Sequence, residues 1–334
     1  MVTAPAHSVA VVGGGQLGSR YLQGLVWCRQ PVRIHLVDPD LDALGVARAL
    51  WSDAGGPPSP HIVEFHSGPK TLPRDLDLAI VSTTSGARPD AIESLSKHAN
   101  IGSWVLEKVL AQSHRDLDRI MTTIGDSTPA WVNTWARTTP WFQQIRREVG
   151  TGPLVVEIKG SSWGLGCNAI HFMDLFTWWT GEELLAVDGA GLDRRWPEAK
   201  RAGHYELSGQ LRATFSSGTT IILRSTPPSE PGAPAGTDII DCMTIETADD
   251  LWAVNQPFSD TSGSAIGMSG ARIDGRVELQ SERTGPLVDS ILNTGTCELP
   301  DLVTSTRQHR LLLSSLLKAR PHLEGIAHDQ VPIT

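Results

Sequence analysis

The chain has 334 residues and a mass of 36.0 kDa, which is enough for two domains of ordinary size. Its formal net charge is −9 and its pI is about 5.6, so we expect neither nucleic acid nor an anionic membrane as its main partner. Its four cysteines form no C-x-x-C pair, and no apolar run approaches the ~18 residues of a membrane span. Because the first expected strand begins within ten residues of Met1, we expect no signal peptide and a reduced, cytoplasmic protein.

The stretch from Ser8 to Asp38 predicts a strand, a glycine turn, a helix and a second strand. Its first apolar run, 9–12, is too short for a helix and rich in β-branched residues, as in a buried parallel strand. The turn that follows fits the G-x-G-x-x-G pattern, and an acidic residue comes twenty positions after its last glycine. A strand before the turn, a helix after it and the acidic residue together predict a dinucleotide-binding site.

Each part of that motif has a physical role. Glycine permits a positive φ, a close approach of the backbone to a pyrophosphate, and tight packing of helix on strand. The unpaired amides at the helix N-terminus then face the phosphates. Asp38 can accept hydrogen bonds from the adenosine ribose and would repel a 2′-phosphate, so NAD is favoured over NADP. The residues expected to hold NAD here are Gly13, Gly15, Gln16, Leu17, Gly18 and Asp38.

Strands and helices keep alternating to about Asn133, which is typical of a doubly wound parallel sheet. The further strands are expected near 61–65, 76–81, 103–106 and 131–133. Ligands of such sheets bind beyond the carboxyl ends of the strands, and Lys108 lies at such an end. There a lysine can have a lowered pKa and can hydrogen-bond a substrate alcohol. The alternative is a solvated Glu107–Lys108 pair at a strand terminus.

Beyond Pro140 partly alternating segments follow one another without helices between them, which predicts an antiparallel sheet. These segments lie near 154–159, 205–215, 219–224 and 239–247. The Ser/Gly-rich stretch 259–270 is expected to be a loop, and a closing helix is expected from about Pro300 to Pro321.

The fold class is therefore α/β, with an N-terminal Rossmann sheet and a C-terminal α+β domain whose sheet is mostly antiparallel. We expect an NAD-binding domain over residues 1–136 and a substrate-binding and oligomerisation domain over residues 137–334. The closing helix can pack back on the first domain.

A helix around 167–180 carries the second set of candidates. Asn168 can cap it, and Thr180-Gly181 ends it. His171 and Asp174 are three residues apart and share a face, and a histidine in the first turn is disfavoured as the charged imidazolium. That arrangement suits a general base taking a proton from an alcohol. The alternative is a His/Asp pair with a structural role.

Other chemistries find less support in the sequence. Cys167 and His171 are four apart and could ligate zinc, but no nearby residue has the spacing of a third ligand, so we predict no metal site. A Ser-His-Asp hydrolase is disfavoured because the chain has no G-x-S-x-G elbow.

The order of these motifs resembles the Gfo/Idh/MocA oxidoreductases, the relatives of glucose–fructose oxidoreductase and inositol dehydrogenase. Three short motifs carry the resemblance: Glu107-Lys108 where the family has Glu-Lys-Pro, His171-Phe172-Met173-Asp174 in a helix, and Arg137-Thr138-Thr139-Pro140 ahead of the second domain. Val109 replaces the family's proline, and the likeness runs from Ser8 to about Gly181 and more loosely to the closing helix.

The resemblance implies a role for each matched residue. Lys108 would contact the reacting hydroxyl and help to relay its proton, His171 would be the acid/base, and Asp174 would orient the substrate or the histidine. Ser82, Thr83 and Thr84 would line the cofactor, with Glu107 near the nicotinamide ribose. The resemblance also implies a homodimer or homotetramer.

The motifs and the resemblance together predict an NAD-dependent oxidoreductase acting on a secondary alcohol or the matching ketone. The resemblance implies that the substrate is a sugar, a polyol or a nucleotide-linked sugar. Trp163 can stack on a sugar ring or pack in the core, and Arg137 can meet a phosphate or carboxylate; with Asn168 they are the candidate substrate contacts. Two alternatives stay open. One is an enzyme that keeps NAD bound and uses transient oxidation for epimerisation or glycoside cleavage, and the other is a non-catalytic NAD-binding regulatory protein.

Overall fold

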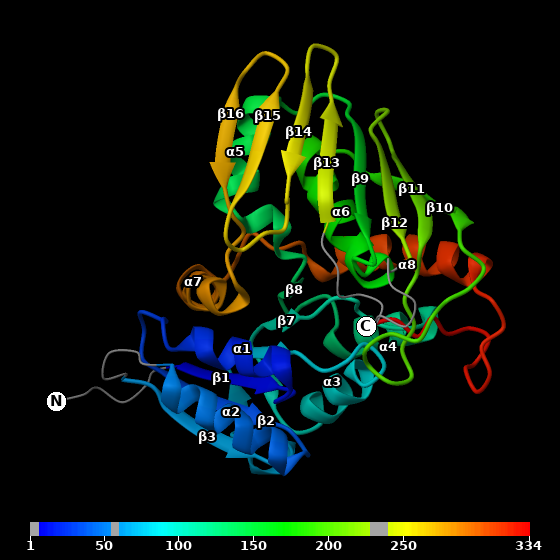
Figure 1. Ribbon diagram of the computed structural model, residues 1–334. Helices are drawn as coiled ribbons and strands as arrows, with labels where there is room; N and C mark the ends of the chain where they lie inside the picture. The colour runs from blue at the N-terminus through cyan, green and yellow to red at the C-terminus, as the bar shows by residue number, and fades with distance from the viewer. Residues whose placement is uncertain (1–6, 55–59, 228–239) are drawn as a thin grey trace. The chain divides into compact units, whose positions relative to one another are not determined.

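The computed structural model describes residues 7–54, 60–227 and 240–334. The chain forms two compact units, and each contains one large β-sheet (Figure 1). Unit 1 comprises Met1–Ala111, Arg115–Asn133 and Glu278–Val303, and unit 2 comprises Gln112–His114, Thr134–Val277 and Thr304–Thr334. None of the helices in the described ranges has both the length and the hydropathy that crossing a bilayer requires.

Unit 1 is built on a six-stranded sheet in which every neighbouring pair of strands is parallel, in the order β3-β2-β1-β5-β7-β8. The strands are β1 (His7–Val12), β2 (Val32–Val37), β3 (Ile62–His66), β5 (Leu78–Val81), β7 (Trp104–Leu106) and β8 (Ala130–Val132). The connecting helices are α1 (Gln16–Leu25), α2 (Leu41–Asp53), the short η1 (Pro69–Thr71), α3 (Arg88–Ser96) and α4 (His114–Ile124). The predicted doubly wound parallel sheet is confirmed.

The strand expected over 76–81 is divided in the structure. β4 (Asp75–Leu76) pairs with β6 (Asn100–Ile101) in a separate two-stranded sheet, and only β5 joins the large sheet. Asp77 separates the two pieces, but one polar residue in an otherwise apolar segment does not by itself predict a change of partner.

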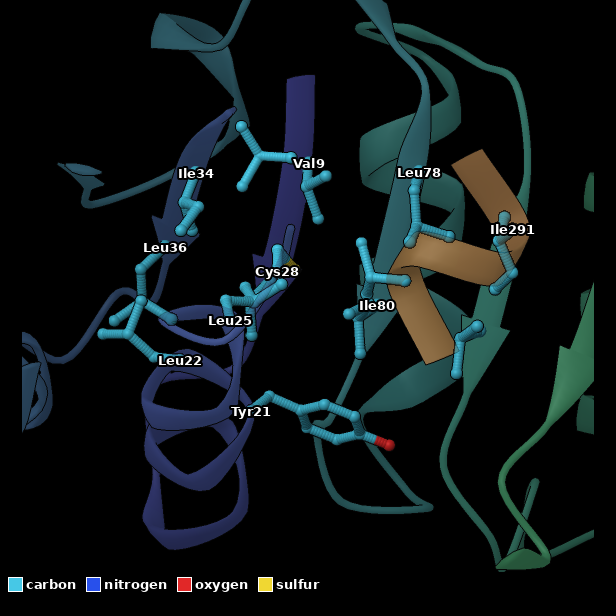
Figure 2. Close-up of a cluster of buried hydrophobic side chains, with 14 of the residues drawn as sticks. Val9, Tyr21, Leu22, Leu25, Cys28, Ile34, Leu36, Leu78, Ile80 and Ile291 are labelled. Carbon is cyan, nitrogen blue, oxygen red and sulfur yellow. The ribbon is translucent and has the colours of Figure 1, made fainter. Parts of the chain in front are cut away.

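One face of the large sheet in unit 1 carries a hydrophobic core, which Figure 2 shows in close-up. Strand residues point toward the side chains of α1 and of α7 (Gln280–Thr294). The labelled members of this core are Val9, Tyr21, Leu22, Leu25, Cys28, Ile34, Leu36, Leu78, Ile80 and Ile291. Burial of such side chains, at roughly 1.5–3 kcal/mol each, is what holds α1 and α7 on the sheet.

The helix α7 joins this core although the sequence assigns its residues to the second domain. Gly24 of α1 and Gly285 of α7 let the two helices approach closely, because a Cβ at Gly24 would lie 2.6 Å from the Cβ of Thr284. Residues 278–303 therefore belong to unit 1. The chain enters unit 2 at Thr134, near the expected boundary between residues 136 and 137, but it returns to unit 1 at Glu278.

Unit 2 is built on an eight-stranded sheet whose order is β10-β11-β12-β9-β13-β14-β15-β16. All neighbouring pairs are antiparallel except β12 with β9, which confirms the predicted mostly antiparallel sheet. The strands are β9 (Val155–Ser161), β10 (Leu184–Leu192), β11 (Gly209–Phe215), β12 (Thr220–Thr226), β13 (Ile240–Glu246), β14 (Leu251–Asn255), β15 (Gly263–Gly267) and β16 (Arg272–Gly275). The helical segments are η2 (Trp135–Thr138), α5 (Pro140–Val149), α6 (Leu165–Thr180) and α8 (Leu302–Ala319).

The loop expected over 259–270 is wrong in part, because β15 lies within it and pairs with β14 and β16. These strands are rich in glycine for a packing reason. A Cβ at Gly263 or at Gly275 would lie within 2.4 Å of the ring of Trp141 in α5. The glycines therefore let two strands cross the face of a tryptophan, whereas in the sequence they look like loop residues.

Candidate active site

The predicted glycine turn connects β1 to α1. Gly13 has a φ of +101°, which an L side chain rarely adopts, and a Cβ at Gly18 would lie 1.7 Å from the carbonyl oxygen of Gly13. Gly15 is the N-cap of α1, and no side chain caps that helix end. A Cβ at Gly15 would meet nothing within 4 Å, so open space lies in front of the first amides of α1.

Asp38 lies at the end of β2, beside this turn. Its Oδ2 accepts a hydrogen bond from the amide of Gly14 at 2.5 Å, and its Oδ1 accepts one from the amide of Asp40 at 2.8 Å. Each carboxylate oxygen keeps a further lone pair. The carboxylate is therefore held in a fixed orientation and can still accept bonds from the two hydroxyls of a ribose.

Ser82, Thr83 and Thr84 follow β5 and lie against the same turn. The Ser82 hydroxyl donates toward the carbonyl oxygens of Gly13 and Val12, at 2.9 and 3.1 Å. The Thr83 hydroxyl is buried without a hydrogen-bond partner among the residues described. A buried hydroxyl of this kind can bond to a polar group of a ligand or to a water molecule.

The residues at this sheet edge fit an adenine dinucleotide. The amides of Gln16 and Leu17 precede the first bond of the helix, which runs from Ser19 to Gly15 at 2.9 Å, so they are available to a phosphate. The oriented carboxylate of Asp38 suits the ribose, and the Thr83 hydroxyl offers a further donor. The structure thus brings the cofactor candidates of unit 1 together, Glu107 excepted.

Two glycines of the turn should respond differently to substitution. Gly15→Val places a side chain in open space, so we expect a small change in melting temperature and a roughly tenfold or greater weakening of NAD binding. Gly18→Ala forces Cβ into a backbone carbonyl, so we expect about 3 kcal/mol or more of destabilisation. Thermal unfolding and titration calorimetry with NAD measure the two effects. Equal melting temperatures for the two variants would contradict this assignment.

Glu107 was expected near the nicotinamide ribose, but the structure places its carboxylate in the interior of unit 1. Only 3% of the residue is exposed, and it accepts hydrogen bonds from the hydroxyl of Tyr21 and, at 2.6 Å, from Asn133 Nδ2. Burial, and then the charge of Glu107, raise the pKa of Tyr21 well above its usual value. The neutral phenol therefore stays a donor, and Glu107 links α1 to the end of β8.

Lys108 comes directly after Glu107 and is half-buried, and the peptide bond between Lys108 and Val109 is cis. The segment after it is fixed by Arg88, whose guanidinium donates to the carbonyl oxygens of Val109, Leu110 and Thr83. Burial lowers the pKa of Arg88 to about 10, and the side chain is 1% exposed. Sequence analysis missed this residue, because a buried arginine that binds carbonyl groups leaves no spacing signal.

The helix α6 of unit 2 carries His171 and Asp174. It runs from Leu165 to Thr180 and ends at Gly181 in a left-handed conformation, which confirms the predicted end. Its N-cap is Gly164, and the side chain of Asn168 donates from Nδ2 to the carbonyl oxygen of Trp163 at 2.8 Å, so the expected capping by Asn168 is wrong.

The helix begins at Leu165, earlier than expected, because two glycines start it where the sequence suggested a turn. His171 is therefore in the second turn and not in the first, and the helix dipole acts on it less than predicted. The side chain is 2% exposed and lies among aromatic rings, with its ring centre 5.2 Å from that of Trp135 and 6.1 Å from that of Phe258.

Asp174 is fully buried and accepts hydrogen bonds from the segment that precedes α5. The Thr134 hydroxyl donates to Oδ2 at 2.8 Å, and Arg137 Nη1 donates to Oδ1 at 3.1 Å. Burial raises the pKa of Asp174 to about 6, and the charge of Arg137 opposes the rise. Arg137, a candidate for binding a substrate anion, is thus paired with Asp174 and fixes η2 on α6.

A hollow of about 470 Å³ opens in unit 2 at the N-terminal end of α6. It is lined by Trp163, Asn168, Ile240, Gln256, Phe258, Ser259, Asp260 and Thr261. Trp163 is 3% exposed and its Nε1 donates to the carbonyl of Arg224 at 2.8 Å, so it packs in the core and forms part of the wall of the hollow. An aromatic wall beside hydroxyl, amide and carboxylate groups suits a polyhydroxylated ligand.

Phe258 lies between this hollow and His171, and sequence analysis missed it. Its ring stacks on Phe172 at 4.8 Å with the planes 2° apart and meets Trp135 at 5.0 Å. The signal that could have found it is a single aromatic residue in a polar loop, Gln256-Pro257-Phe258-Ser259.

Solved structures of three dehydrogenases align with this chain over most of its length. A scyllo-inositol dehydrogenase from Lactobacillus casei, solved with bound NAD(H) and scyllo-inositol, aligns over 94% of this chain and 96% of its own at 16% identity, with a TM-score of 0.67. The UDP-N-acetylglucosamine 3-dehydrogenase of Acidithiobacillus ferrooxidans aligns over 92% and 96% at 15% identity, with a TM-score of 0.66. The myo-inositol 2-dehydrogenase of Lactobacillus plantarum aligns over 94% and 97% at 13% identity, with a TM-score of 0.65.

The chain has the fold of the Gfo/Idh/MocA-type oxidoreductases. The resemblance predicted from the sequence is thereby confirmed at the level of the fold. No protein-family model matches the chain, and no curated protein matches it significantly in sequence.

Proposed function

We propose that this protein is an NAD-dependent oxidoreductase that transfers a hydride between nicotinamide and a secondary alcohol, or the matching ketone, of a sugar, polyol or nucleotide-linked sugar. The observation that carries the proposal is the open glycine turn with the oriented carboxylate of Asp38 beside it. The buried His171 and Asp174 on one helix support it, as does the fold shared with inositol and sugar-nucleotide dehydrogenases.

The cofactor residues are those at the strand ends of unit 1. The amides of Gln16 and Leu17 hold the pyrophosphate, Asp38 holds the adenosine ribose, and the Thr83 hydroxyl supplies a further donor. When bound, NAD supplies the hydride acceptor for alcohol oxidation and the hydride donor for ketone reduction.

The proton is handled by the chain's own side chains. Lys108 donates a hydrogen bond to the reacting oxygen and stabilises the negative charge that develops there. His171 accepts the hydroxyl proton as the C–H hydrogen leaves with its electron pair, and it returns that proton when the ketone is reduced. The aromatic rings around His171 exclude water from the imidazole.

Asp174 is a positioning residue in this proposal. Its carboxylate takes hydrogen bonds from Thr134 and Arg137, so it fixes the approach to α5 against the helix that carries His171. The side chain of Gln308 in α8 donates a further hydrogen bond to the carboxylate of Asp174. The η2 segment and α8 are thus both anchored to one carboxylate of α6.

The hollow lined by Trp163, Asn168 and Phe258 is the substrate-binding region in this proposal. A sugar or cyclitol ring presents apolar C–H faces to aromatic side chains and hydroxyl groups to the amide and carboxylate groups. Arg137 is excluded from this set, because it is paired with Asp174.

We also propose that the chain forms a homo-oligomer through one face of the eight-stranded sheet. This is the face opposite the buried one. Val155, Leu251 and Ile266 are apolar, and they are 48%, 39% and 37% exposed. Exposed apolar residues on a sheet are typical of an interface.

A substrate screen tests the proposed function. The full chain is incubated with NAD, or separately with NADP, and with inositols, aldoses and nucleotide sugars, while the near-ultraviolet absorbance of the reduced cofactor is followed. We expect net NADH with at least one polyol, a preference for NAD over NADP, and loss of that preference in Asp38→Ala. A reduced cofactor that forms once per chain and does not accumulate would indicate transient oxidation instead. NAD binding without hydride exchange would indicate a regulatory protein.

A further inference from the structure

The face of the unit 1 sheet opposite the apolar core carries a cluster of polar side chains. His35 of β2 pairs in register with Glu64 of β3, and His66 lies two residues further along β3. Side chains two apart on a strand share a face, so all three point away from the core residues Ile34 and Leu36. The ligand atoms of His35, Glu64 and His66 all lie within 4.8 Å of one another.

The distances within this cluster match the ligand cage of a metal ion. His35 Nδ1 lies 3.1 Å from His66 Nε2, and Glu64 Oε2 lies 3.5 Å from His35 Nδ1 and 3.8 Å from His66 Nε2. Ligands at ~2.0–2.2 Å from a tetrahedral zinc ion are separated by roughly 3.3–3.5 Å. The three atoms therefore need to move by only a few tenths of an ångström to bind one ion.

Neighbouring groups orient each of the three side chains. His35 Nε2 lies 3.1 Å from the Ser8 hydroxyl, and His66 Nδ1 lies 2.8 Å from the Thr71 hydroxyl. When those outer nitrogens donate to the hydroxyl oxygens, both inner nitrogens present lone pairs to the same point. Outer hydrogen bonds of this kind orient histidine ligands in metal sites.

The carboxylate of Glu64 is oriented by Arg33. Arg33 Nη1 pairs with Oε1 at 2.5 Å and leaves Oε2 on the side of the imidazoles. His35 and His66 are 1% and 8% exposed, whereas the Glu64 side chain is 40% exposed. Two buried nitrogens and one accessible oxygen form a site that is built into the sheet and that an ion can enter from solvent.

We propose that His35, Glu64 and His66 bind a divalent transition-metal ion, with zinc as the ion that best fits two imidazoles and one carboxylate. Water takes the fourth position. The ion links β2 to β3, and through Thr71 it fixes the turn η1. The alternative that the test must separate is a hydrogen-bonded pair of neutral histidines without an ion.

The sequence contains a weak signal for this site. Glu64-Phe65-His66 places two ligand types on one face of a strand, but His35 is distant in the chain, and only the pairing of β2 with β3 brings it close. The three ligands together are therefore not recognisable from their spacing in the sequence.

Zinc titration of the full, tag-free chain after chelator treatment tests the proposal. We expect one zinc ion bound per chain and a melting temperature that rises with zinc concentration, because an ion that binds only the folded state stabilises it. Glu64→Gln should weaken zinc binding by roughly tenfold or more, and His66→Gln should abolish the one-to-one binding. With Co²⁺ we expect visible bands of a tetrahedral site without thiolate charge transfer.

The matched control is Glu157→Gln. Glu157 is also a strand carboxylate held by cations, Lys159 at 2.7 Å and Arg224 at 2.6 Å, but it lies in unit 2. This variant should bind zinc as the unchanged chain does. The proposal would be overturned if the unchanged chain did not bind zinc one to one. It would also be overturned if the Glu64 and His66 variants bound zinc as tightly as the unchanged chain does. Circular dichroism of Glu64→Gln, whose side chain is partly exposed, confirms that lost binding does not reflect unfolding.

Discussion

His171→Ala is expected to lower the turnover of a substrate found by the screen by about 10² to 10⁴-fold, while the affinity for NAD stays unchanged. His171 lies in unit 2 among aromatic rings, and the cofactor residues lie in unit 1, so removal of the imidazole leaves the glycine turn intact. Lys108→Met should likewise lower turnover and preserve NAD binding. Steady-state kinetics over a range of pH, with calorimetry for NAD, measure both effects.

A buried histidine elsewhere in unit 2 provides the control for His171. His309 of α8 is fully buried, and its Nδ1 bonds to the carbonyl of Ser305 at 2.8 Å. His309→Ala removes an imidazole of equal size from a helix, so it should lower the melting temperature about as much as His171→Ala and leave turnover nearly unchanged. Equal turnover in His171→Ala and the unchanged chain would remove the proposed role of the imidazole.

The nucleotide-binding unit could be predicted because its signals are local. The apolar run of β1, the glycines after it and Asp38 lie within one continuous stretch, and each position is set by neighbours in sequence. The end of α6 was predictable for the same reason, since Gly181 terminates the helix by its own left-handed conformation.

The remaining differences arise from contacts between distant parts of the chain. Nothing near Gly285 shows that α7 packs on α1, because the close approach depends on a second glycine at position 24. The partners of Glu107 are likewise remote, at Tyr21 and Asn133, so a carboxylate beside Lys108 looks like a site residue in the sequence. A spacing pattern reports which residues share an element, and it does not report what faces them.

The pairing of Arg137 with Asp174 is likewise a contact that spacing in the sequence does not reveal, and its loss should lower the stability of the protein. Arg137→Met should destabilise the protein by about 3–5 kcal/mol at pH 8, because it leaves a fully buried carboxylate without its cation. Asp174 already has a pKa raised to about 6 by burial, and loss of Arg137 should raise it further. Thermal or denaturant unfolding between pH 5 and pH 8 measures the effect.

The sign of the pH dependence follows from proton binding. A carboxyl whose pKa is higher in the folded state binds more protons there, so stability falls as pH rises from the unfolded pKa of ~3.9 through the folded pKa. In Arg137→Met the fall continues to a higher pH than in the unchanged chain. The difference between the two proteins should therefore be small near pH 5, where Asp174 is protonated in the variant, and largest above pH 7.

Two further variants separate this electrostatic effect from lost packing. Arg307→Met breaks an exposed ion pair with Glu183, whose side chains are 63% and 54% exposed, so it should change stability by less than about 1 kcal/mol at any pH. The double variant Arg137→Met with Asp174→Asn should recover part of the lost stability and lose the added pH dependence, because no buried charge remains. An equal loss at pH 5 and pH 8 in Arg137→Met would instead assign the effect to packing of the arginine side chain.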